Sequence, residues 1–238
     1  MTISILTLFP QMFQGPFAHS IIKKSVEKGL VTIRIINIRD FGIGRHKIVD
    51  DAPYGGGSGM IMRVDVVHRA IDFAKNSLPS KLPLIILLNP DGKPFTQKKA
   101  ISLAKLEHLI LICGHYEGID SRIDHFIDEK LSIGDYVLTG GEIPAIVVTD
   151  TVVRLIKDVL KQGVTHSESF SGASGYLEYP QFTRPRIYQK LSVPQTLLAG
   201  DHNKIRTWRE KQSVKKTRLT RPDLIKKSLG ALYKSPPR

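Results

Sequence analysis

Cysteine is almost absent from this sequence: Cys113 is the only one among 238 residues, so an intrachain disulfide is excluded. We read Cys113 as a small buried hydrophobe, in a chain suited to a reducing compartment. Long apolar runs are also missing, since a membrane-spanning helix needs about 20 apolar residues. The apolar start, Thr2 to Phe9, lacks a basic leader and is cut short by Pro10, so a first strand is predicted rather than a signal peptide. These absences predict a cytoplasmic protein without a membrane partner.

Two kinds of binding motif are lacking as well. The histidines are scattered, and no Cys/His spacing is typical of a zinc site, so no structural metal is predicted. The glycine-rich loop Gly55–Gly59 is followed by Met60 and Ile61, whereas a P-loop continues with Lys and Ser or Thr. It also does not sit directly between a strand and a helix, as a dinucleotide fingerprint must. From the residues alone, this is a mobile structural loop.

Acidic residues are scarce in the last third of the chain. Residues 1–160 contain 19 Lys and Arg against 17 Asp and Glu, a net charge of +2, whereas residues 161–238 contain 16 against 5, a net charge of +11. A concentrated basic region favours a polyanionic partner, and nucleic acid above an anionic membrane. A solvated basic tail is the alternative. Spaced apolar residues favour a folded module instead: Leu197, Leu198, Ile205, Trp208, Leu219, Leu224, Ile225, Leu229 and Leu232.

Periodicity predicts an α/β fold with a mainly parallel sheet over residues 1–160, because apolar strand segments alternate with helical patterns. The strands are expected at Thr2–Leu8, Val31–Ile38, Leu84–Leu88 and Leu109–Cys113, and the helices at Ala18–Lys28, Met62–Asn76, Phe95–Lys105, Ile119–Phe126 and Glu142–Leu160. A long loop is expected over residues 40–60. The Ser/Gly/Thr-rich stretch within 161–175 predicts a flexible linker. Residues 176–238 predict a small basic domain of short helices only.

Two glycine-punctuated stretches adjoin the apolar segments: Cys113-Gly-His-Tyr-Glu-Gly-Ile-Asp120 and Ser132-Ile-Gly-Asp-Tyr-Val-Leu-Thr-Gly-Gly-Glu142. We read each as a strand, a tight glycine turn and a helix, with Val137–Leu138 ending a strand. In an open α/β sheet this arrangement presents backbone groups to a ligand at the carboxyl edge. The acids Glu117 and Asp120 also fit a plain helix start, where negative charge is favourable without any function.

Together with Pro53-Tyr-Gly-Gly-Gly-Ser-Gly-Met60 and Pro180-Gln-Phe-Thr-Arg-Pro185, these stretches closely resemble the bacterial tRNA (guanine-N1)-methyltransferases of the anticodon loop, a SPOUT-class family. The resemblance covers nearly the whole chain, with four motifs in the family's order. It implies S-adenosylmethionine as methyl donor and N1 of the tRNA guanosine at position 37, just 3′ of the anticodon, as acceptor. It also implies a homodimer whose active sites are shared across the interface, a reaction assisted by magnesium, and a deep trefoil knot around Leu88–Gly141. No motif shows a magnesium site, and no periodicity shows a knot.

The resemblance also implies the site residues. The cofactor site would comprise Pro90, Gly114, Tyr116, Glu117, Ile133, Gly134, Asp135, Tyr136, Val137, Leu138, Gly140 and Gly141. The tRNA site would comprise Tyr54, Gly55, Gly56, Gly57, Gly59, Met60, Glu178, Thr183, Arg184 and Arg209. Backbone recognition of a cofactor explains why glycines and aliphatics fill the first set. In the second set, the basic residues are expected to contact phosphates.

Two residues are implied to be catalytic. Arg154 matches the family's catalytic arginine, although on its own it fits a solvated charge with a packed aliphatic stem. Glu168 stands where the family usually has the aspartate that removes the N1 proton of guanine, and both carboxylates are ionised at neutral pH. Arg154 would offset charge that develops on the base.

Two alternatives stay open. A non-catalytic RNA-binding protein would share the basic C-terminal region but would not need the glycine turns at Gly114 and Gly140–Gly141. A SPOUT-class methyltransferase that acts on a ribose 2′-oxygen or on ribosomal RNA would also transfer a methyl group from S-adenosylmethionine. Only the set of four motifs disfavours this alternative.

Overall fold

The chain divides into two compact units, Met1–Leu160 and Lys161–Arg238, each described below by itself. A computed structural model describes residues 1–78, 81–172 and 174–225. The apolar residues Leu229 and Leu232, expected in the basic module, lie outside these ranges, as do the rest of 226–238.

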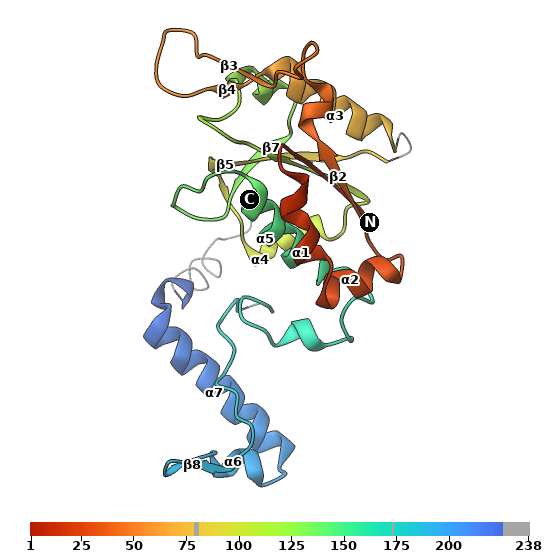
Figure 1. Cartoon of the computed structure of the whole chain (residues 1–238). Coiled ribbons are helices and arrows are strands. Elements are labelled where there is room, and N and C mark those ends of the chain that lie inside the picture. Colours follow the sequence, from red (N-terminus) through yellow and green to blue (C-terminus); the bar gives the residue numbers. More distant parts are fainter. Residues whose placement is uncertain (79–80, 173, 226–238) are drawn as a thin grey trace, which may run out of the picture. The chain divides into compact units, whose positions relative to one another are not determined.

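A five-stranded sheet organises the first unit (Figure 1). Its order is β2-β1-β6-β5-β7, and every pairing is parallel. The strands are β1 (Thr2–Thr7), β2 (Thr32–Asn37), β5 (Leu84–Pro94), β6 (His108–Cys113) and β7 (Glu129–Ser132). The predicted α/β class with a mainly parallel sheet is therefore confirmed. β1 and β6 lie inside the sheet and are buried along their whole length, as expected for strands covered on both faces.

Helices cover both faces of this sheet. On one face, Ile3, Ile5, Leu109 and Leu111 pack with α5 (Glu142–Val153), α4 (Gln97–Leu103) and the 3₁₀ turn η1 (Pro10–Phe13). On the other face, Leu6, Ile110 and Ile112 pack with α3 (Val64–Asn76) and the 3₁₀ turns η2 (Ile38–Phe41) and η3 (Ser121–His125). Side chains of successive strand residues point to opposite faces, so each strand supplies both cores. The remaining elements of the unit are α1 (Gln14–Phe17), α2 (Ser20–Glu27), β3 (Asp50–Asp51) and β4 (Ile61–Met62).

β5 is longer than predicted, and β7 was not predicted. Leu88 pairs with Leu131, the register then shifts, and Lys93 pairs with Leu131 as well, so residues 89–92 leave the ladder and return to it. β7 escaped prediction because Glu129 and Lys130 give its four residues no apolar pattern. The strand that was expected at Val137–Leu138 is instead part of a loop, and the strand before the glycine turn is β7.

The long helix predicted at Glu142–Leu160 ends at Val153, with Arg154 as its C-cap rather than within it. Beyond it, amide-to-carbonyl bonds three residues apart form successive turns, from Leu155 to Val152 (3.0 Å) and from Val159 to Ile156 (3.2 Å). These turns still pack Ile156 and Val159 against the core, which explains why the apolar spacing continues past the end of the helix.

The second unit is built along α7 (His202–Thr220), a single helix of 19 residues where only short helices were predicted. Asp201 caps it by accepting from the amides of Asn203 (3.1 Å) and Lys204 (3.0 Å). The preceding chain lies along it: the Leu177 amide donates to Thr217 Oγ1 (3.0 Å), and Ser213 Oγ donates to the Leu177 carbonyl (2.6 Å). The unit also contains η4 (Val164–His166), α6 (Gln195–Leu198) and an unpredicted hairpin of β8 (Ile187–Tyr188) and β9 (Leu191–Ser192).

Candidate active site

A cavity of about 240 Å³ lies in the first unit at the carboxyl edge of the sheet. Its walls are the ends of β5, β6 and β7, the turn after β6, and the loop that leads into α5. Parallel α/β sheets bind ligands at this edge. The lining residues are Leu88, Asn89, Pro90, Gly114, His115, Tyr116, Glu117, Gly118, Leu131, Ser132, Ile133, Gly134, Tyr136, Val137, Leu138, Thr139, Gly140, Gly141 and Pro144.

Eleven of the twelve residues predicted for the cofactor site line this cavity, and Asp135 is the exception. They come from three separate parts of the chain: Pro90 within β5, where that strand leaves the ladder, the turn Gly114–Glu117 after β6, and the loop Ile133–Gly141 after β7. Tyr116 has a φ of 59°, in the left-handed region that non-glycine residues rarely adopt. Such strain often occurs at functional sites.

The glycine turn Gly140–Gly141 brings the start of α5 against the end of β6. The Gly141 amide donates to the Gly114 carbonyl (2.8 Å), and a Cβ on Gly141 would lie 2.6 Å from the Cys113 α-carbon. A Cβ on Gly140 would lie 2.4 Å from Glu142 Oε2 and 2.6 Å from His115 Nδ1. Real Cβ atoms do not approach backbone that closely, so Gly141 must be glycine for this close approach, whereas a Cβ on Gly140 would require the Glu142 and His115 side chains to move.

Behind the turn is a buried polar group that sequence analysis missed. Glu142, 2% exposed, accepts from Thr7 Oγ1 (2.8 Å), the hydroxyl at the end of β1. Thr7 Oγ1 also accepts from the Phe9 amide (2.9 Å). Burial, and then the nearby Glu142 carboxylate, raise the pKa of the Cys113 thiol well above its ordinary value, so this thiol is inert.

His115 is a second lining residue to which no role was assigned. Its ring lies beside those of Phe9 and Tyr116, with centroids 4.8 and 4.9 Å away. Its Nδ1 is buried and has no hydrogen-bond partner among the described residues. Both His115 and Glu142 lie within the stretches singled out from the sequence, but nothing there indicates that they converge beside Gly140.

The residues present fit a nucleoside-type methyl donor. Apolar side chains of Leu88, Pro90, Ile133 and Leu138 share the cavity with main-chain groups of glycines, and an orphaned buried nitrogen of His115 faces the same turn. A mostly apolar cavity with a few convergent polar groups is typical of cofactor sites. In contrast, among the described residues no group of three or more His, Cys, Asp or Glu side chains could hold a metal ion.

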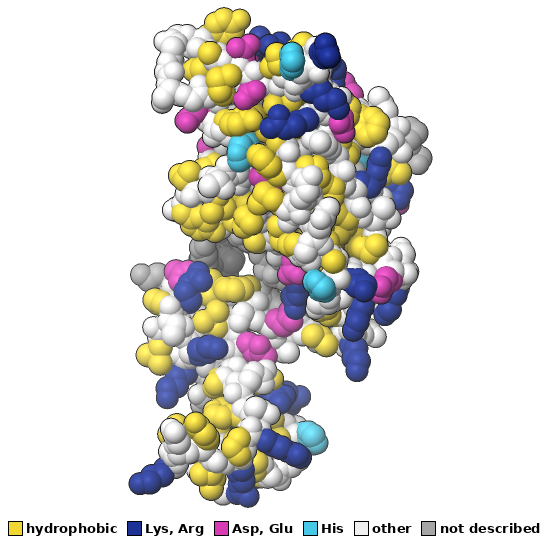
Figure 2. All heavy atoms as spheres, viewed as in Figure 1, with side chains coloured by type: hydrophobic (Ala, Val, Ile, Leu, Met, Phe, Trp, Pro, Cys, Tyr) yellow, Lys and Arg dark blue, Asp and Glu magenta, His cyan; other side chains and the backbone are white. Residues whose placement is uncertain are grey.

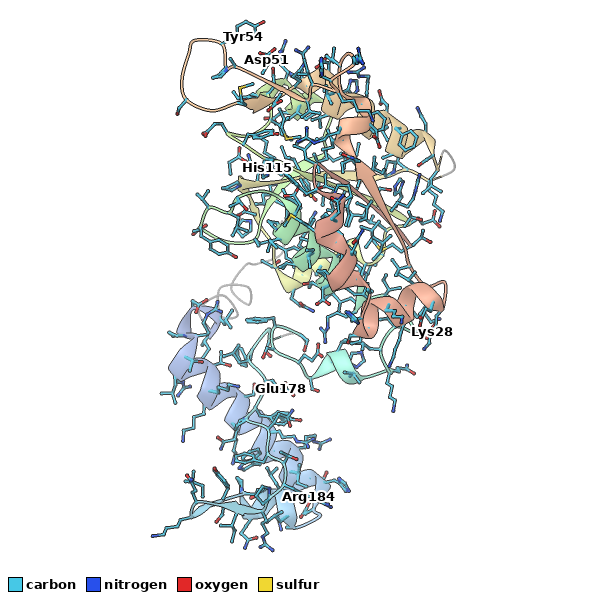
Figure 3. All side chains as sticks on the ribbon, viewed as in Figure 1. Lys28, Asp51, Tyr54, His115, Glu178 and Arg184 are labelled. Atoms are coloured by element: carbon cyan, nitrogen blue, oxygen red, sulfur yellow. The ribbon has the colours of Figure 1, made fainter. Side chains whose placement is uncertain are left out.

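The glycine-rich loop meets the cavity through its last residues. The Glu117 amide donates to the Met60 carbonyl (3.1 Å), and a Cβ on Gly59 would collide with the Glu117 side chain. The loop therefore packs on the turn that lines the cavity. Tyr54, at the other end of the loop, is 99% exposed and projects into solvent (Figure 3). Gly55, Gly56 and Gly57 adopt positive φ in the same exposed stretch.

Neither predicted catalytic residue lines the cavity. Arg154 is half-buried at the end of α5 in the first unit. Glu168 belongs to the second unit, in a turn where the Ser171 amide donates to the Glu168 carbonyl (3.1 Å). The next residue, Ser169, accepts from the Glu178 amide through its Oγ (3.0 Å), which ties this turn to the chain that follows it.

The remaining predicted tRNA-binding residues also belong to the second unit. Thr183 and Arg184 line a hollow of about 330 Å³ beside the β8–β9 hairpin. Arg209, on α7, lies over the ring of Tyr179 at 4.8 Å, and Gln181 donates from its amide to the Glu178 carboxylate. Figure 2 shows Lys and Arg side chains spread over this unit with few acids among them.

Comparisons with known proteins identify the family. The sequence matches the family described as "tRNA (Guanine-1)-methyltransferase TrmD" over residues 1–227. The chain belongs to this family. A tRNA (guanine-N(1)-)-methyltransferase of Pelotomaculum thermopropionicum is 50% identical over 230 residues, which cover 96% of this chain and 91% of the relative. Relatives with the same name are 52% identical in Dictyoglomus turgidum, over 95% of this chain and 90% of the relative, and 49% identical in Bacillus subtilis, over 95% and 93%.

No helix in the described parts of the chain is long and apolar enough to cross a membrane.

Proposed function

We propose that this enzyme transfers a methyl group from S-adenosylmethionine to N1 of the guanosine at position 37 of tRNA, just 3′ of the anticodon. The observation that carries the proposal is the cavity at the carboxyl edge of the sheet, in a chain that belongs to the tRNA (guanine-1)-methyltransferase family. The name of the relatives supports guanine N1 as the acceptor over a ribose oxygen. A purely RNA-binding role would leave the glycine-walled cavity unexplained.

The cavity residues bind and orient the methyl donor in this proposal. When bound, the donor supplies an electrophilic methyl carbon. Main-chain groups of the Gly140–Gly141 turn and of the loop after β7 would contact it, with the apolar sides of Pro90, Ile133 and Leu138 around it. Holding donor and acceptor in line supplies much of the rate acceleration of a displacement. The loop Tyr54–Met60, which packs on Glu117, would form part of the guanosine pocket.

Glu168 is the proposed base. N1 of guanine carries a proton at neutral pH, so the lone pair that attacks the methyl carbon becomes available only when that proton leaves. A carboxylate within about 3 Å of N1–H can accept it. As the proton leaves, Arg154 would stabilise the negative charge that develops on the guanine ring, and transfer of the methyl group then neutralises that charge. The segment 161–175 that carries Glu168 is proposed as the linker that closes over the guanine.

Residues 176–238, the part of the second unit that follows the linker, are proposed to bind the anticodon stem and loop. Their charge supports this role, because Lys and Arg neutralise phosphates and release counterions. Arg184, beside the hairpin, and Arg209, on α7, are the residues expected to contact RNA, with Thr183 and Glu178 in supporting positions (Figure 3).

A deep trefoil knot is part of the proposal. Residues 89–92 leave the sheet and return to pair with Leu131 a second time, and a Cβ on Gly92 would lie 2.4 Å from the Leu131 amide nitrogen. The backbone at Leu131 is thus in close contact with both parts of β5. This close contact supports a threaded connection, which is otherwise rare in proteins.

A homodimer in the cytoplasm completes the proposal. The loop after β7 exposes the large side chains of Tyr136, Val137 and Leu138. Exposed apolar patches typically mark interaction surfaces. Magnesium is assigned no step, because the described residues contain no group of acids placed to hold it.

The test is single-turnover methylation of unmodified tRNA with labelled methyl donor, followed by mapping of the modified base. We expect the label at N1 of guanosine 37. Glu168→Gln keeps size and hydrogen bonding but removes the base, so the rate should fall by roughly 10²–10⁴-fold while donor affinity is unchanged. Glu168→Asp should retain partial activity.

Glu210→Gln provides the matched control, since Glu210 is an exposed acid of the same unit. It should leave the rate unchanged. A Glu168→Gln rate within a few-fold of the parent would remove Glu168 from the mechanism. Label on a ribose or on another base would overturn the proposed reaction itself.

A further inference from the structure

Glu142 is a buried carboxylate for which the proposed reaction has no use. It is 2% exposed, whereas the other acidic residue at the cavity, Glu117, lines it from an exposed turn. Burying a carboxylate costs free energy unless hydrogen bonds or opposite charge compensate. Here the hydroxyl of Thr7 donates to Oε1 at 2.8 Å, and the carboxylate lies in the first turn of α5, where the helix dipole favours negative charge.

This carboxylate is directed at the cavity wall. Its Oε2 lies so close to Gly140 that a Cβ there would meet it at 2.4 Å, and Gly140 lines the cavity. Only the glycine turn therefore separates the negative charge from the cavity. The same charge acts on Cys113, whose pKa it helps to raise, so its field reaches the end of β6 as well.

Positive charge is missing from the cavity. Among the described residues that line it there is no Lys and no Arg, while Glu117 is in the lining and Glu142 lies directly behind it. A chain with a formal net charge of +13 thus presents a locally negative pocket. Such a pocket attracts a cation and offers nothing to an anion.

We propose that Glu142 makes this cavity select a sulfonium cation over the corresponding neutral thioether. The inference rests on the proposed function, because the methyl donor is a sulfonium and the product that remains after transfer is a thioether. Loss of the methyl group removes the positive charge, so the attraction to Glu142 ends at that step. Glu142 thereby holds the substrate and weakens retention of the product.

Calorimetric titration of the full-length protein with two probes tests this: S-adenosylmethionine and S-adenosylhomocysteine. They differ by one methyl group and one charge. We expect the parent to prefer the sulfonium by on the order of tenfold, a modest effect for unit charges several ångströms apart at a partly hydrated site. Glu142→Gln keeps the hydrogen bond with Thr7 and removes the charge. It should reduce the preference to about twofold or less, with thioether affinity unchanged.

Thr7→Val is the matched control, because it removes the hydrogen bond and leaves the charge. It should retain the preference even if the protein becomes less stable. Thioether binding by each variant reports an intact cavity. If Glu142→Gln keeps the parent's preference, the inference is wrong.

A second measurement on the parent does not depend on the variant folding. An analogue that carries a protonated amine in place of the sulfonium should bind on the order of tenfold more tightly than the thioether. Equal affinities of the parent for cationic and neutral probes overturn the inference. If the parent binds none of the three probes, the proposed methyl donor fails instead, which is a different result.

Discussion

His108 is a residue at which stability should depend on pH. It is fully buried at the start of β6, with Nε2 3.0 Å from Ser4 Oγ, and its Nδ1 has no partner among the described residues. Burial, followed by the positive charges of Arg34 and Lys81, lowers the pKa of His108 below its ordinary value. The folded state therefore holds a neutral imidazole, whereas the unfolded chain takes up a proton near pH 6.5.

The sign of the effect follows from the lowered pKa. The unfolded state binds more protons, so this contribution to stability is present above about pH 6.5 and is lost as the pH falls toward the folded-state pKa. The slope of the free energy of unfolding is at most about 1.4 kcal/mol per pH unit for one proton.

Urea unfolding between pH 7.5 and 5 should show this loss, and His108→Gln should reduce the pH dependence. His46→Gln, at an exposed loop position, should leave it unchanged. Equal slopes in the parent and His108→Gln would contradict the prediction.

At individual residues, the sequence located the glycine turns that the structure shows, whereas the cofactor role of the residues around them stays a prediction. The glycines at 114, 140 and 141 punctuate apolar segments, and eleven of the predicted cofactor residues do come together at one cavity. Glu142 escaped because its partner, Thr7, lies 135 positions away, and no local pattern reports such a contact. The proposed roles of Arg154 and Glu168 rest on resemblance and stay predictions.

At the scale of elements, periodicity predicted those strands and helices that bury a continuous apolar face. β1 and β6 are buried throughout, so their apolar runs were visible. β7 was missed because Glu129 and Lys130 leave only two of its four residues buried, which is too short a pattern to recognise. The length of α7 was underestimated because apolar side chains are sparse along it. The helix is supported instead by the cap at Asp201 and by the hydrogen bonds that join Leu177 to Thr217 and Ser213.

The irregularity at residues 89–92 of β5 gives an element-scale prediction. A Cβ on Gly92 would lie 2.4 Å from the Leu131 amide nitrogen and 2.5 Å from its carbonyl carbon, and neither backbone atom can move without breaking the β5–β7 ladder. Gly92→Ala should therefore lower the free energy of unfolding by about 2–4 kcal/mol. Urea unfolding monitored by circular dichroism measures it.

Gly15 supplies the control for this prediction. It lies in α1, and a Cβ there would have no atom within 4 Å. Gly15→Ala should change the free energy of unfolding by less than about 1 kcal/mol, because the better helix propensity of alanine is opposed by Pro16, which disfavours a Cβ on the preceding helical residue. A Gly92→Ala protein as stable as Gly15→Ala would mean that the close approach at Leu131 does not constrain the fold.

At the scale of the whole molecule, charge and apolar exposure are distributed unequally. Residues 161–238 have a net charge of +11 against +2 for residues 1–160, a difference that was visible in the sequence because charge is a property of composition. An exposed apolar loop could not be predicted in the same way. Val137 and Leu138 were read as the end of a strand, since a pattern of apolar residues does not reveal which of them a partner covers.

That exposed loop supports the proposed dimer and gives the last prediction. Tyr136, Val137 and Leu138 are 55%, 85% and 39% exposed, and a monomer would leave all three in water. Leu82, 94% exposed and outside this loop, is a matched control. In a dimer that buries the loop, Val137→Asp would place an unpaired carboxylate in the apolar contact, which is costly. Dimerisation should weaken by roughly tenfold or more, about 1.4 kcal/mol.

Sedimentation equilibrium at micromolar concentration measures this directly. The parent and Leu82→Asp should sediment as dimers, and Val137→Asp should shift toward monomer while keeping its circular dichroism spectrum. Because Val137 also lines the cavity, methyl-donor affinity should be measured on the same samples. If binding and association decline together as the protein is diluted, then the cavity depends on the partner subunit. A parent that sediments only as monomer would end the dimer proposal, whatever the variant does.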